Sequence, residues 1–311
     1  VCPGTVTECT NPNSNIRGVE EYYRYRDYNI CGLNCTTYNI EWWGQNRNGG
    51  ITSGAANQGI GSFQTTLNLA LQPCNSSPQF TSVPVPYVCQ GQPFTFNQGA
   101  FDPDGDSLSY SFGPCFNENN QQVNYNTGYD PLNPLGPSWQ VNINPVNGDV
   151  SFIPQPGNIE VGVLCVYVSE WRNGQIINTV VRDIQVNVIP CPANFLPTVP
   201  TVNNIQNGSG QGGSAGGVVV ATCIGSNLCF DLPVVDANTQ DSVTIWWDST
   251  LTGITFQETG NPSVTDTIMG QNPSVTVCYT PTTAGVFSFL VEMQDNACPN
   301  FGFNQFTVTI I

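Results

Sequence analysis

The chain lacks both lysine and histidine, and its only basic residues are six arginines against 22 acidic residues. With a formal net charge of -16, its surface repels the phosphates of nucleic acids and anionic lipid headgroups. The missing side chains include the most common general base, the most common metal-binding side chain and the amine that forms Schiff bases. We therefore expect no nucleic-acid partner, and much of enzyme chemistry is excluded from the start.

The sequence also lacks a long apolar run and any CxxC pair. No stretch approaches the roughly 20 apolar residues of a membrane-spanning helix, so we expect no direct membrane insertion. Thirteen single cysteines in a chain without histidine favour disulfides over zinc ligands, and hence an oxidising compartment. Because neither an initiator methionine nor a signal peptide is present, we interpret the chain as an extracellular segment of a mature, longer secreted protein.

Helical periodicity is a third feature that is nearly absent. Short runs of alternating apolar and polar residues recur instead, such as FTFNQ, WQVNINP, VTIWW and FTVTII, and turn residues are plentiful, with 31 Gly and 24 Pro. This pattern predicts an all-β fold with frequent turns. The NG pairs at Asn147-Gly148 and Asn173-Gly174 are typical of tight hairpins.

Two parts of the sequence share one order of strand-like runs and turns. Cys89 precedes Asp102 by 13 residues, and Cys223 precedes Asp236 by the same number. The strand LSYSF then matches VTIWW, VLCVYVSEW matches FSFLVEMQD, and IQVNVIP matches the closing FTVTII. About seven short strands in units of about 100 residues are typical of immunoglobulin-like and cadherin-like sandwiches.

The repeat predicts tandem β-sandwich domains in an elongated arrangement. A small or partial β-sandwich domain spans 1–74, an immunoglobulin-like or cadherin-like domain spans 75–191, and a second copy spans 192–311. The glycine-rich run 206–217 has two interpretations: an interdomain hinge, or an extended early loop inside the last domain, which the repeat favours. Residues 1–33 show no pattern that can be placed.

The stretch AFDPDGDSLSY puts three aspartates, Asp102, Asp104 and Asp106, on a turn directly after a predicted strand. Alternating aspartates can converge their oxygens on one hard cation, and Gly105 allows the backbone to curl. The loop lacks the length and the final glutamate of an EF-hand, so calcium would need another ligand. Glu170 is the candidate, because its turn is expected at the same end of the sandwich.

In the second copy the corresponding candidates for a calcium site are Asp236, Asn238, Asp241 and Asp295. The alternative for both loops is a solvated aspartate-glycine turn that is capped by its own backbone. An acid/base pair for glycoside hydrolysis would need two carboxylates roughly 5 to 10 Å apart and a pocket that raises one pKa. One exposed turn offers no such pocket, so we expect no catalytic residue and no cofactor other than calcium.

The positions of the cysteines on the predicted strands suggest three disulfides, although spacing alone fixes no connectivity. Cys89 and Cys191 fall at the same pole of one sandwich, and each other pair falls on strands expected to be neighbours. The predicted bonds are Cys89–Cys191, Cys115–Cys165 and Cys229–Cys278. Cys223 corresponds to Cys89, but its partner would fall just past Ile311, so our hypothesis is a bond to a following domain or subunit.

Two tryptophan pairs, Trp42-Trp43 and Trp246-Trp247, lie on predicted strands. One ring of each pair should point inward and the other outward, because side chains alternate along a strand. The inner ring belongs to the core. The outer ring has two interpretations: a contact with a neighbouring domain or a stacking surface for sugar.

Three segments carry a resemblance to a known family. These segments are CNSSPQFTSVPVPYVCQGQPFTFNQGAFDPDGDSLSY, VSEWRNGQIINTVVRDIQVNVIPC and CTTYNIEWWGQNRNGGITSG. Over 34–191, and more weakly over 192–311, the chain resembles the large repetitive surface proteins of Bacteroidota that are associated with gliding motility and type IX secretion. The acidic loop departs from that pattern in the last domain, where it has become DANTQD.

The resemblance implies adhesins or filament subunits built of cadherin-like and PKD-like modules, exported to the cell surface. It also implies the O-glycosylation pattern of these bacteria, an aspartate followed by serine or threonine and then an apolar residue or threonine. Here that pattern falls on Ser107, Ser242, Ser249 and Thr267.

We therefore expect a structural, non-enzymatic segment of an extracellular adhesin or filament. Its expected partners are copies of itself, neighbouring domains of the same protein, or glycans and other cells. The alternative is an array of carbohydrate-binding modules attached to a secreted glycoside hydrolase. A planar row of outward tryptophan rings would favour that alternative.

Overall fold

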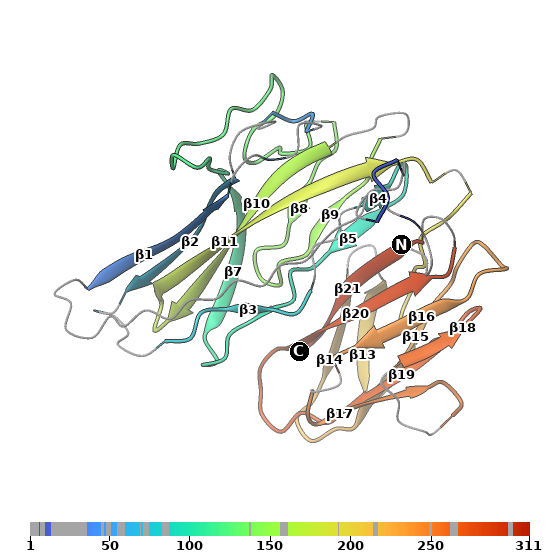
Figure 1. Ribbon diagram of the computed structural model, residues 1–311. Helices are drawn as coiled ribbons and strands as arrows, with labels where there is room; N and C mark the ends of the chain where they lie inside the picture. The colour runs from blue at the N-terminus through green and yellow to red at the C-terminus, as the bar shows by residue number, and fades with distance from the viewer. Residues whose placement is uncertain are drawn as a thin grey trace.

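The computed structural model describes residues 6, 10–13, 36–44, 47, 51–54, 60–68, 70, 75–82, 87–136, 138–155, 161–191, 193–213, 217–248, 251–261, 267–297 and 301–311. Every regular element in these residues is a β-strand, and the strands form two sandwiches (Figure 1). The predicted all-β class with sandwich domains is therefore confirmed. We call strands β1–β11 the first sandwich and strands β12–β21 the second sandwich. No helix of the described residues is long and apolar enough to cross a membrane.

The larger sheet of the first sandwich is built around a long central hairpin. Asn173 and Gly174 form its two-residue turn with φ angles of 54° and 75°, and positive φ at both residues is what this tight turn requires. The sheet has the order β1 (Thr37–Gly44), β2 (Ile60–Asn68), β11 (Gln175–Ile189), β10 (Val161–Arg172) and β7 (Ser107–Gly113), and β4 (Tyr87–Cys89) pairs with the end of β11.

Shorter strands cover one face of this sheet. They are β5 (Phe94–Phe96), β9 (Val150–Phe152) and β8 (Asn142–Ile143), with the separate pair β3 (Gln79–Phe80) and β6 (Ala100–Phe101). Residues of β10 alternate between faces: Leu164 and Val166 enter the main core, while Val163 and Cys165 enter a smaller core on the other side. The central strand is therefore buried on both faces, which explains its nearly continuous apolar sequence.

The β1–β2 hairpin continues this sheet and does not begin a domain of its own. β2 pairs with β11 at Thr65 and Val180, and Arg47 forms an ion pair with Asp183 of β11. β11 has 15 residues, whereas β4, which pairs with one end of it, has only three. The rest of that backbone edge of β11 is therefore available for pairing with another strand. Among the described residues, the expected boundary near residue 74 does not separate two folded units.

The second sandwich has the strand order of an immunoglobulin-like fold, with four strands facing the rest. One sheet runs β12 (Asn203–Gln206), β15 (Leu228–Pro233), β19 (Ser274–Tyr279) and β17 (Ile254–Glu258). The other runs β13 (Gly208–Gly213), β14 (Gly217–Thr222), β21 (Phe303–Ile310), β20 (Phe287–Asp295), β16 (Val243–Trp247) and β18 (Thr267–Gly270).

Most of the described part of the glycine-rich run forms a strand and not a hinge or a loop, because Gly208 to Gly213 make the edge strand β13, which pairs with β14. A Cβ atom at Gly208 or Gly210 would lie 2.5 or 2.7 Å from a carbonyl oxygen of β14. Only glycine permits so close an approach of two backbones. The sequence-based expectation of a loop was wrong, because glycine is a poor strand former in general and yet fits this edge.

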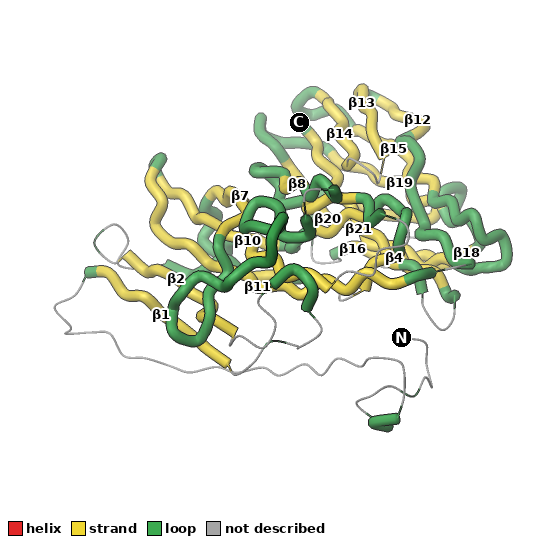
Figure 2. Tube along the Cα trace, turned by 90° about the horizontal axis from the view of Figure 1, so that it is seen from above, coloured by secondary structure: helices red, strands yellow, loops and turns green. Residues whose placement is uncertain are grey.

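The two sandwiches have separate main cores and touch each other beyond the linker. The core of the second sandwich draws only on 199–310, and that of the first on 88–196. β5 of the first sandwich lies against β21 of the second (Figure 1), and the β1–β2 hairpin lies at the far end of the first sandwich (Figure 2). The tandem arrangement is thus held by a lateral contact as well as by the chain.

The two methionines offer a matched test of the second core. Met293 on β20 is fully buried there, whereas Met269 on β18 is 72% exposed. Met293→Ala is expected to destabilise the second sandwich by about 2 to 5 kcal/mol, because it leaves a cavity. Met269→Ala should change stability by less than about 0.5 kcal/mol. Denaturant unfolding followed by tryptophan fluorescence measures both, and equal losses would contradict this core.

Candidate functional site

The acidic loop of the first sandwich joins β6 to β7 and is closed by its own backbone. Asp102 Oδ1 accepts hydrogen bonds from the backbone N–H groups of Asp104 and Asp106 at 2.9 and 3.1 Å. Gly105, with a φ of 84°, donates its N–H to the Asp102 carbonyl at 3.2 Å. Oxygens of the three carboxylates also lie within 4.8 Å of one another. The loop is thus a capped turn whose acidic groups could hold a metal ion.

Arg172, the last residue of β10, supplies positive charge to this loop. Its Nε donates to Asp106 Oδ1 at 2.6 Å, and its Nη2 forms an ion pair with Asp106 Oδ2. The same Nη2 lies 3.7 Å from Asp104 Oδ2. Hydrogen bonding to this guanidinium is the main reason that the pKa of Asp106 lies below its usual value. Part of the negative charge at the loop is therefore already balanced by the protein.

Glu170 on β10 is the fourth carboxylate of this group and is fully buried. Its Oε2 accepts from Asn178 Nδ2 at 3.1 Å, but its Oε1 has no hydrogen-bond partner, and neither does Asp102 Oδ2. Burial raises the pKa of Glu170 to about 7, and the Asp106 and Asp102 carboxylates act in the same direction. The structure brings Glu170 to the acidic loop, where the sequence analysis expects it.

The corresponding group in the second sandwich consists of Asp236 and Asp241, between β15 and β16, and Asp295, which ends β20. Their oxygens also lie within 4.8 Å of one another. Asp236 and Asp295 are only 4% and 2% exposed. Burial raises the pKa of both, and neighbouring carboxylates add to the effect. In the described part of the chain, no arginine forms an ion pair with this group.

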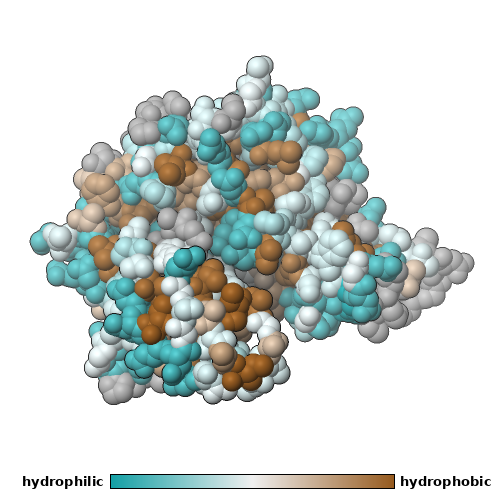
Figure 3. Space-filling view, turned by 180° about the vertical axis from the view of Figure 1, so that it is seen from behind, coloured by the Kyte–Doolittle hydropathy of each residue, from teal (hydrophilic) through white to brown (hydrophobic). Residues whose placement is uncertain are grey.

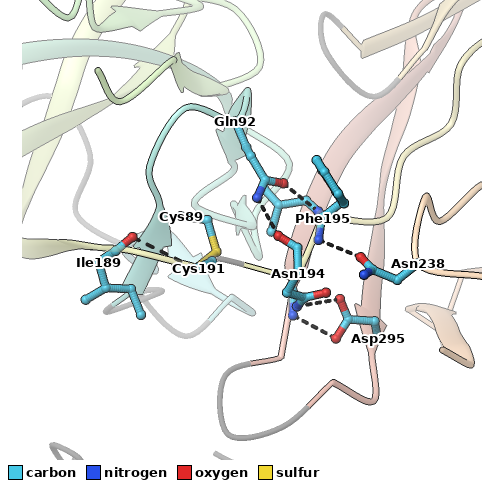
Figure 4. Close-up of a disulfide and its surroundings, with 10 residues drawn as sticks. Cys89, Gln92, Ile189, Cys191, Asn194, Phe195, Asn238 and Asp295 are labelled. Atoms are coloured by element: carbon cyan, nitrogen blue, oxygen red, sulfur yellow. Dashed lines mark hydrogen bonds between the residues drawn. A yellow bond between two sulfur atoms is a disulfide. The ribbon is translucent and has the colours of Figure 1, made fainter. Parts of the chain in front are cut away.

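Asn238, expected among the ligands of this group, binds the linker between the sandwiches. Its Oδ1 accepts from the Phe195 N–H at 2.7 Å, and its Nδ2 donates to the Ala193 carbonyl at 2.7 Å. Asp295 Oδ2 accepts from the side chain of Asn194, the residue between these two, at 3.0 Å (Figure 4). The second acidic group is thus built into the domain junction.

The first sandwich holds the same linker from the other side. The Cys89–Cys191 disulfide ties the start of the linker to the end of β4 (Figure 4). Gln92 then donates to the Asn194 carbonyl and accepts from the Leu196 N–H, both at 2.7 Å. Leu196 itself is buried in the main core of the first sandwich. Backbone polar groups of the linker are therefore shared between the two sandwiches.

A buried polar contact joins the sandwiches a second time, at β5 and β21. Thr307 on β21 donates its hydroxyl to Asp149 Oδ1 at 2.7 Å. Asn97, which follows β5, donates to the same Asp149 oxygen at 2.7 Å and to the Thr307 hydroxyl at 3.0 Å. All three side chains are buried. Burial raises the pKa of Asp149, although its hydrogen bonds oppose that effect.

The three disulfides of the described residues are the pairs that the sequence analysis expects. They are Cys89–Cys191, Cys115–Cys165 and Cys229–Cys278. The last bond is cross-strand, since Cys229 of β15 and Cys278 of β19 are opposite each other in the ladder. Cys223 is a free, exposed thiol. The other cysteines lie outside the described residues.

The remaining candidates are spread over the surface. Trp247 points into the core and stacks on Phe256 at 4.5 Å between ring centroids, whereas half-buried Trp246 donates its indole N–H to Glu292 at 2.6 Å. The side chains of the other tryptophan pair are outside the described residues. Among the predicted O-glycosylation positions, Ser107 and Thr267 are exposed and Ser242 is half-buried, while Ser249 is not described.

The hollows of the described surface are shallow and contain few titratable groups. One of about 440 Å³ lies over β12 and β15 and contains a single carboxylate, Asp231. Both oxygens of Asp231 are bonded, to Thr276 and Asn204. Another of about 360 Å³ lies near the end of β21 and is lined by apolar residues such as Ile311. Figure 3 shows apolar patches interrupted by polar residues on the face seen from behind.

Sequence reasoning missed the residues that build the junction. Gln92, Asn97, Asn194 and Thr307 stand in no motif, and each acts only because a distant segment lies opposite it. A signal was present at one point, because Asn194 follows the domain-ending Cys191 in the predicted linker. Nothing in the sequence indicates that its side chain reaches Asp295.

Comparisons with known proteins assign no family. No protein-family model matches the chain, and no curated protein matches it. Similar solved structures include human protocadherin-24 EC1-2, with 14% identity, a TM-score of 0.24 and coverage of 76% of this chain and 99% of that one. Chimeric titin Z1Z2 shows 12% identity, a TM-score of 0.22 and coverage of 76% and 97%.

An endo-fucoidan hydrolase of glycoside hydrolase family 107 shows 14% identity and a TM-score of 0.24. The match covers 78% of this chain but only 35% of the hydrolase. Likenesses at these TM-scores carry no weight for function. The fold assignment therefore comes from the strand order itself.

The raised pKa of Glu170 predicts a pH dependence of stability. A glutamate whose pKa is about 7 in the folded protein and 4.5 ordinarily favours folding when protonated. That contribution is complete below pH 4.5 and is lost as the pH rises through 7. Glu170→Gln should remove this pH-dependent contribution. Between pH 4.5 and 8, the free energy of unfolding of the wild type should therefore fall by on the order of 2 kcal/mol relative to that of the variant.

Urea unfolding at several pH values measures this difference, and subtracting the curve of the variant removes the contribution of the other buried carboxyl groups. The matched control is Glu118→Gln, since Glu118 is exposed in the same sandwich. Parallel pH curves for wild type and Glu170→Gln would contradict the buried, protonated glutamate.

Proposed function

We propose that the chain is a non-enzymatic structural segment of an extracellular adhesin or filament, in which two disulfide-stapled sandwiches act as one stiff beam. The observation that carries this proposal is the junction, where the linker is held by both sandwiches. A linker whose backbone groups bind only water bends freely, whereas here Gln92 and Asn238 hydrogen-bond the linker backbone from the two sandwiches.

The lateral contact supports the same function. The triad of Asn97, Asp149 and Thr307 is buried, and its hydrogen bonds are lost if the sandwiches move apart. An unpaired buried donor or acceptor costs about 1 to 3 kcal/mol, so separation is opposed at this contact in addition to the linker. A stiff pair of domains suits transmission of force along a surface protein.

The chemistry of the described residues supports a role without catalysis. The hollow over β12 and β15 contains one carboxylate whose oxygens are already bonded. The acidic loop offers closely grouped carboxylates, and Arg172 pairs with Asp106 there. A glycosidase pair needs two free carboxylates across a cleft. We assign no catalytic residue.

The finer setting of the proposal rests on the sequence resemblance. On that resemblance we propose that the protein is one of the surface proteins of Bacteroidota that are exported by type IX secretion and associated with gliding motility. The disulfides of both sandwiches are consistent with an extracellular location. We include glycans or other cells as adhesion targets, and calcium as the cation of the acidic loop at Asp102, Asp104, Asp106 and Glu170. Asp102 Oδ2 and Glu170 Oε1 have no hydrogen-bond partner, and carboxylate oxygens are the ligands that calcium prefers.

The second candidate function is a carbohydrate-binding array of a secreted glycoside hydrolase. Half-buried Trp246 is the feature that favours it, because an exposed tryptophan face stacks on sugars. Its indole N–H is already bonded to Glu292, and its ring lies 6.1 Å from that of Phe303. These contacts favour a structural role for Trp246 over a sugar platform.

Electron microscopy of the native material tests the proposed function. A fibre or a projecting stalk with a domain-sized axial repeat is expected. A glycan array probed with the purified chain is the counter-test. Strong binding to one glycan class by particles that show no stalk or fibre would favour the carbohydrate-binding alternative and overturn the structural one.

Stiffness of the junction can be measured separately by small-angle X-ray scattering. Thr307→Val combined with Asn97→Ala removes the lateral hydrogen bonds, so we expect a larger maximum dimension and a broader distance distribution than in wild type. Thr309→Val is the matched control, because Thr309 lies on the same strand and bonds Ser288 within the second sandwich. Identical scattering from all three proteins would show that the contact does not hold the sandwiches together.

A further inference from the structure

The acidic group at the domain junction has no ion pair with an arginine among the described residues. Asp236, Asp241 and Asp295 bring three carboxylates within 4.8 Å, two of them almost fully buried. The described arginines are engaged elsewhere: Arg47 with Asp183, Arg172 with the acidic loop, and Arg182 with Gln98 and Ser82. Buried like charges without a counter-charge are unfavourable.

One oxygen of this group has no partner. Asp236 Oδ1 accepts from the Asn238 N–H at 2.7 Å, whereas the buried Asp236 Oδ2 has no hydrogen-bond partner. Buried polar atoms in folded proteins are nearly always paired, so each exception calls for a bound ligand or a special role. This orphaned oxygen belongs to one of the three grouped carboxylates, so a cation held by the group would give that carboxylate a partner.

The neighbouring carboxylate is held rigidly by the protein. Asp295 Oδ1 accepts from the N–H groups of Ala297 and Gly302 at 2.9 and 2.8 Å, and its Oδ2 accepts from Asn194 at 3.0 Å. A Cβ at Gly302 would lie 2.3 Å from Asp295 Oδ2, so this residue must be glycine for the carboxylate to fit. The site is thus shaped from three sides: a loop, a strand end and the linker.

The donor set indicates the class of ligand. It contains carboxylate oxygens and neither histidine nor cysteine, which is the preference of hard cations and not of zinc. Calcium accepts six to eight oxygens in irregular geometry, whereas magnesium demands a near-ideal octahedron. Two ligands from one loop and one from a strand end suit the more flexible requirement of calcium.

We propose that Asp236, Asp241 and Asp295 bind one calcium ion, and that this ion locks the linker between the two sandwiches. Two asparagines connect the proposed ion to the linker. Asn194 is a linker residue whose side chain donates to Asp295. Asn238 donates its backbone N–H to Asp236, and its side chain hydrogen-bonds the linker backbone. This proposal rests on the beam function, because it makes the stiffness of the beam dependent on calcium.

The two acidic groups are therefore not equivalent. In the first sandwich, Arg172 supplies a fixed positive charge to Asp106 and lies near Asp104. In the second, none of the described arginines supplies such a charge, and the bound cation would do so. The junction site should thus bind calcium more tightly than the Asp102 loop, the reverse of what the aspartate spacing in the sequence suggests.

Isothermal titration of the full chain with calcium chloride, after treatment with EDTA, tests the site. One tight site is expected in wild type, and Asp236→Asn should weaken it at least tenfold without unfolding the protein, because it removes a charge while keeping the shape. Asp102→Asn in the first loop and Asp248→Asn, on an exposed residue of the second sandwich, should leave this site unchanged. Loss of the tight site in Asp102→Asn but not in Asp236→Asn would overturn the assignment, as would no heat at millimolar calcium.

Limited proteolysis at the linker tests the lock. Calcium should slow cleavage at 193–197 in wild type at least several-fold, and magnesium should do so much less. Asn194→Ala should still bind calcium but lose most of this protection, because the linker is no longer tied to Asp295. Calcium binding with unchanged cleavage in wild type would refute the lock, while a structural role shown by microscopy would stand regardless.

Discussion

The structure depends on one shared element, the linker between the sandwiches, whose backbone is hydrogen-bonded by both. The Cys89–Cys191 disulfide fixes where the linker leaves the first sandwich, and Leu196 inserts into the core of that sandwich. From there Asn238 and Asp295 hold it against the second sandwich. Because these bonds join one short linker to both sandwiches, neither sandwich can turn against the other without breaking some of them.

The scarcity of basic residues shapes the polar chemistry of the whole chain. With few arginines available, each described one is placed at a buried or half-buried acceptor: Arg47 at Asp183, Arg172 at Asp106 and Arg182 at Gln98. The same repeated acidic turn therefore has two outcomes. One copy is balanced by an arginine from the adjacent strand, and the other is built into a junction where its carboxylates face one another.

Much of the fold could be predicted because it follows from local patterns in the sequence. Alternation along β10 and β11, the Asn173-Gly174 turn and the spacing of the cysteines act over a few residues or follow from a known strand order. The β1–β2 hairpin could not be assigned to the first sandwich in this way, since its attachment depends on the edge that β11 leaves free. β13 was not predicted, because its glycines are required by the close approach of the neighbouring strand β14 and are not favoured by intrinsic strand propensity.

The sequence alone specified the all-β class, the repeat of one sandwich pattern and the grouping of acidic residues on the turns, and it suggested the three cysteine pairs. These features arise from side-chain periodicity and from covalent or near-neighbour geometry. Only the tertiary structure decided that Glu170 is fully buried, that Asn238 serves the linker and that Asn97, Asp149 and Thr307 meet between sandwiches. The contacts among Asn97, Asp149 and Thr307 join residues more than 50 positions apart, and which side chains meet over such separations is set by the packing of whole sheets.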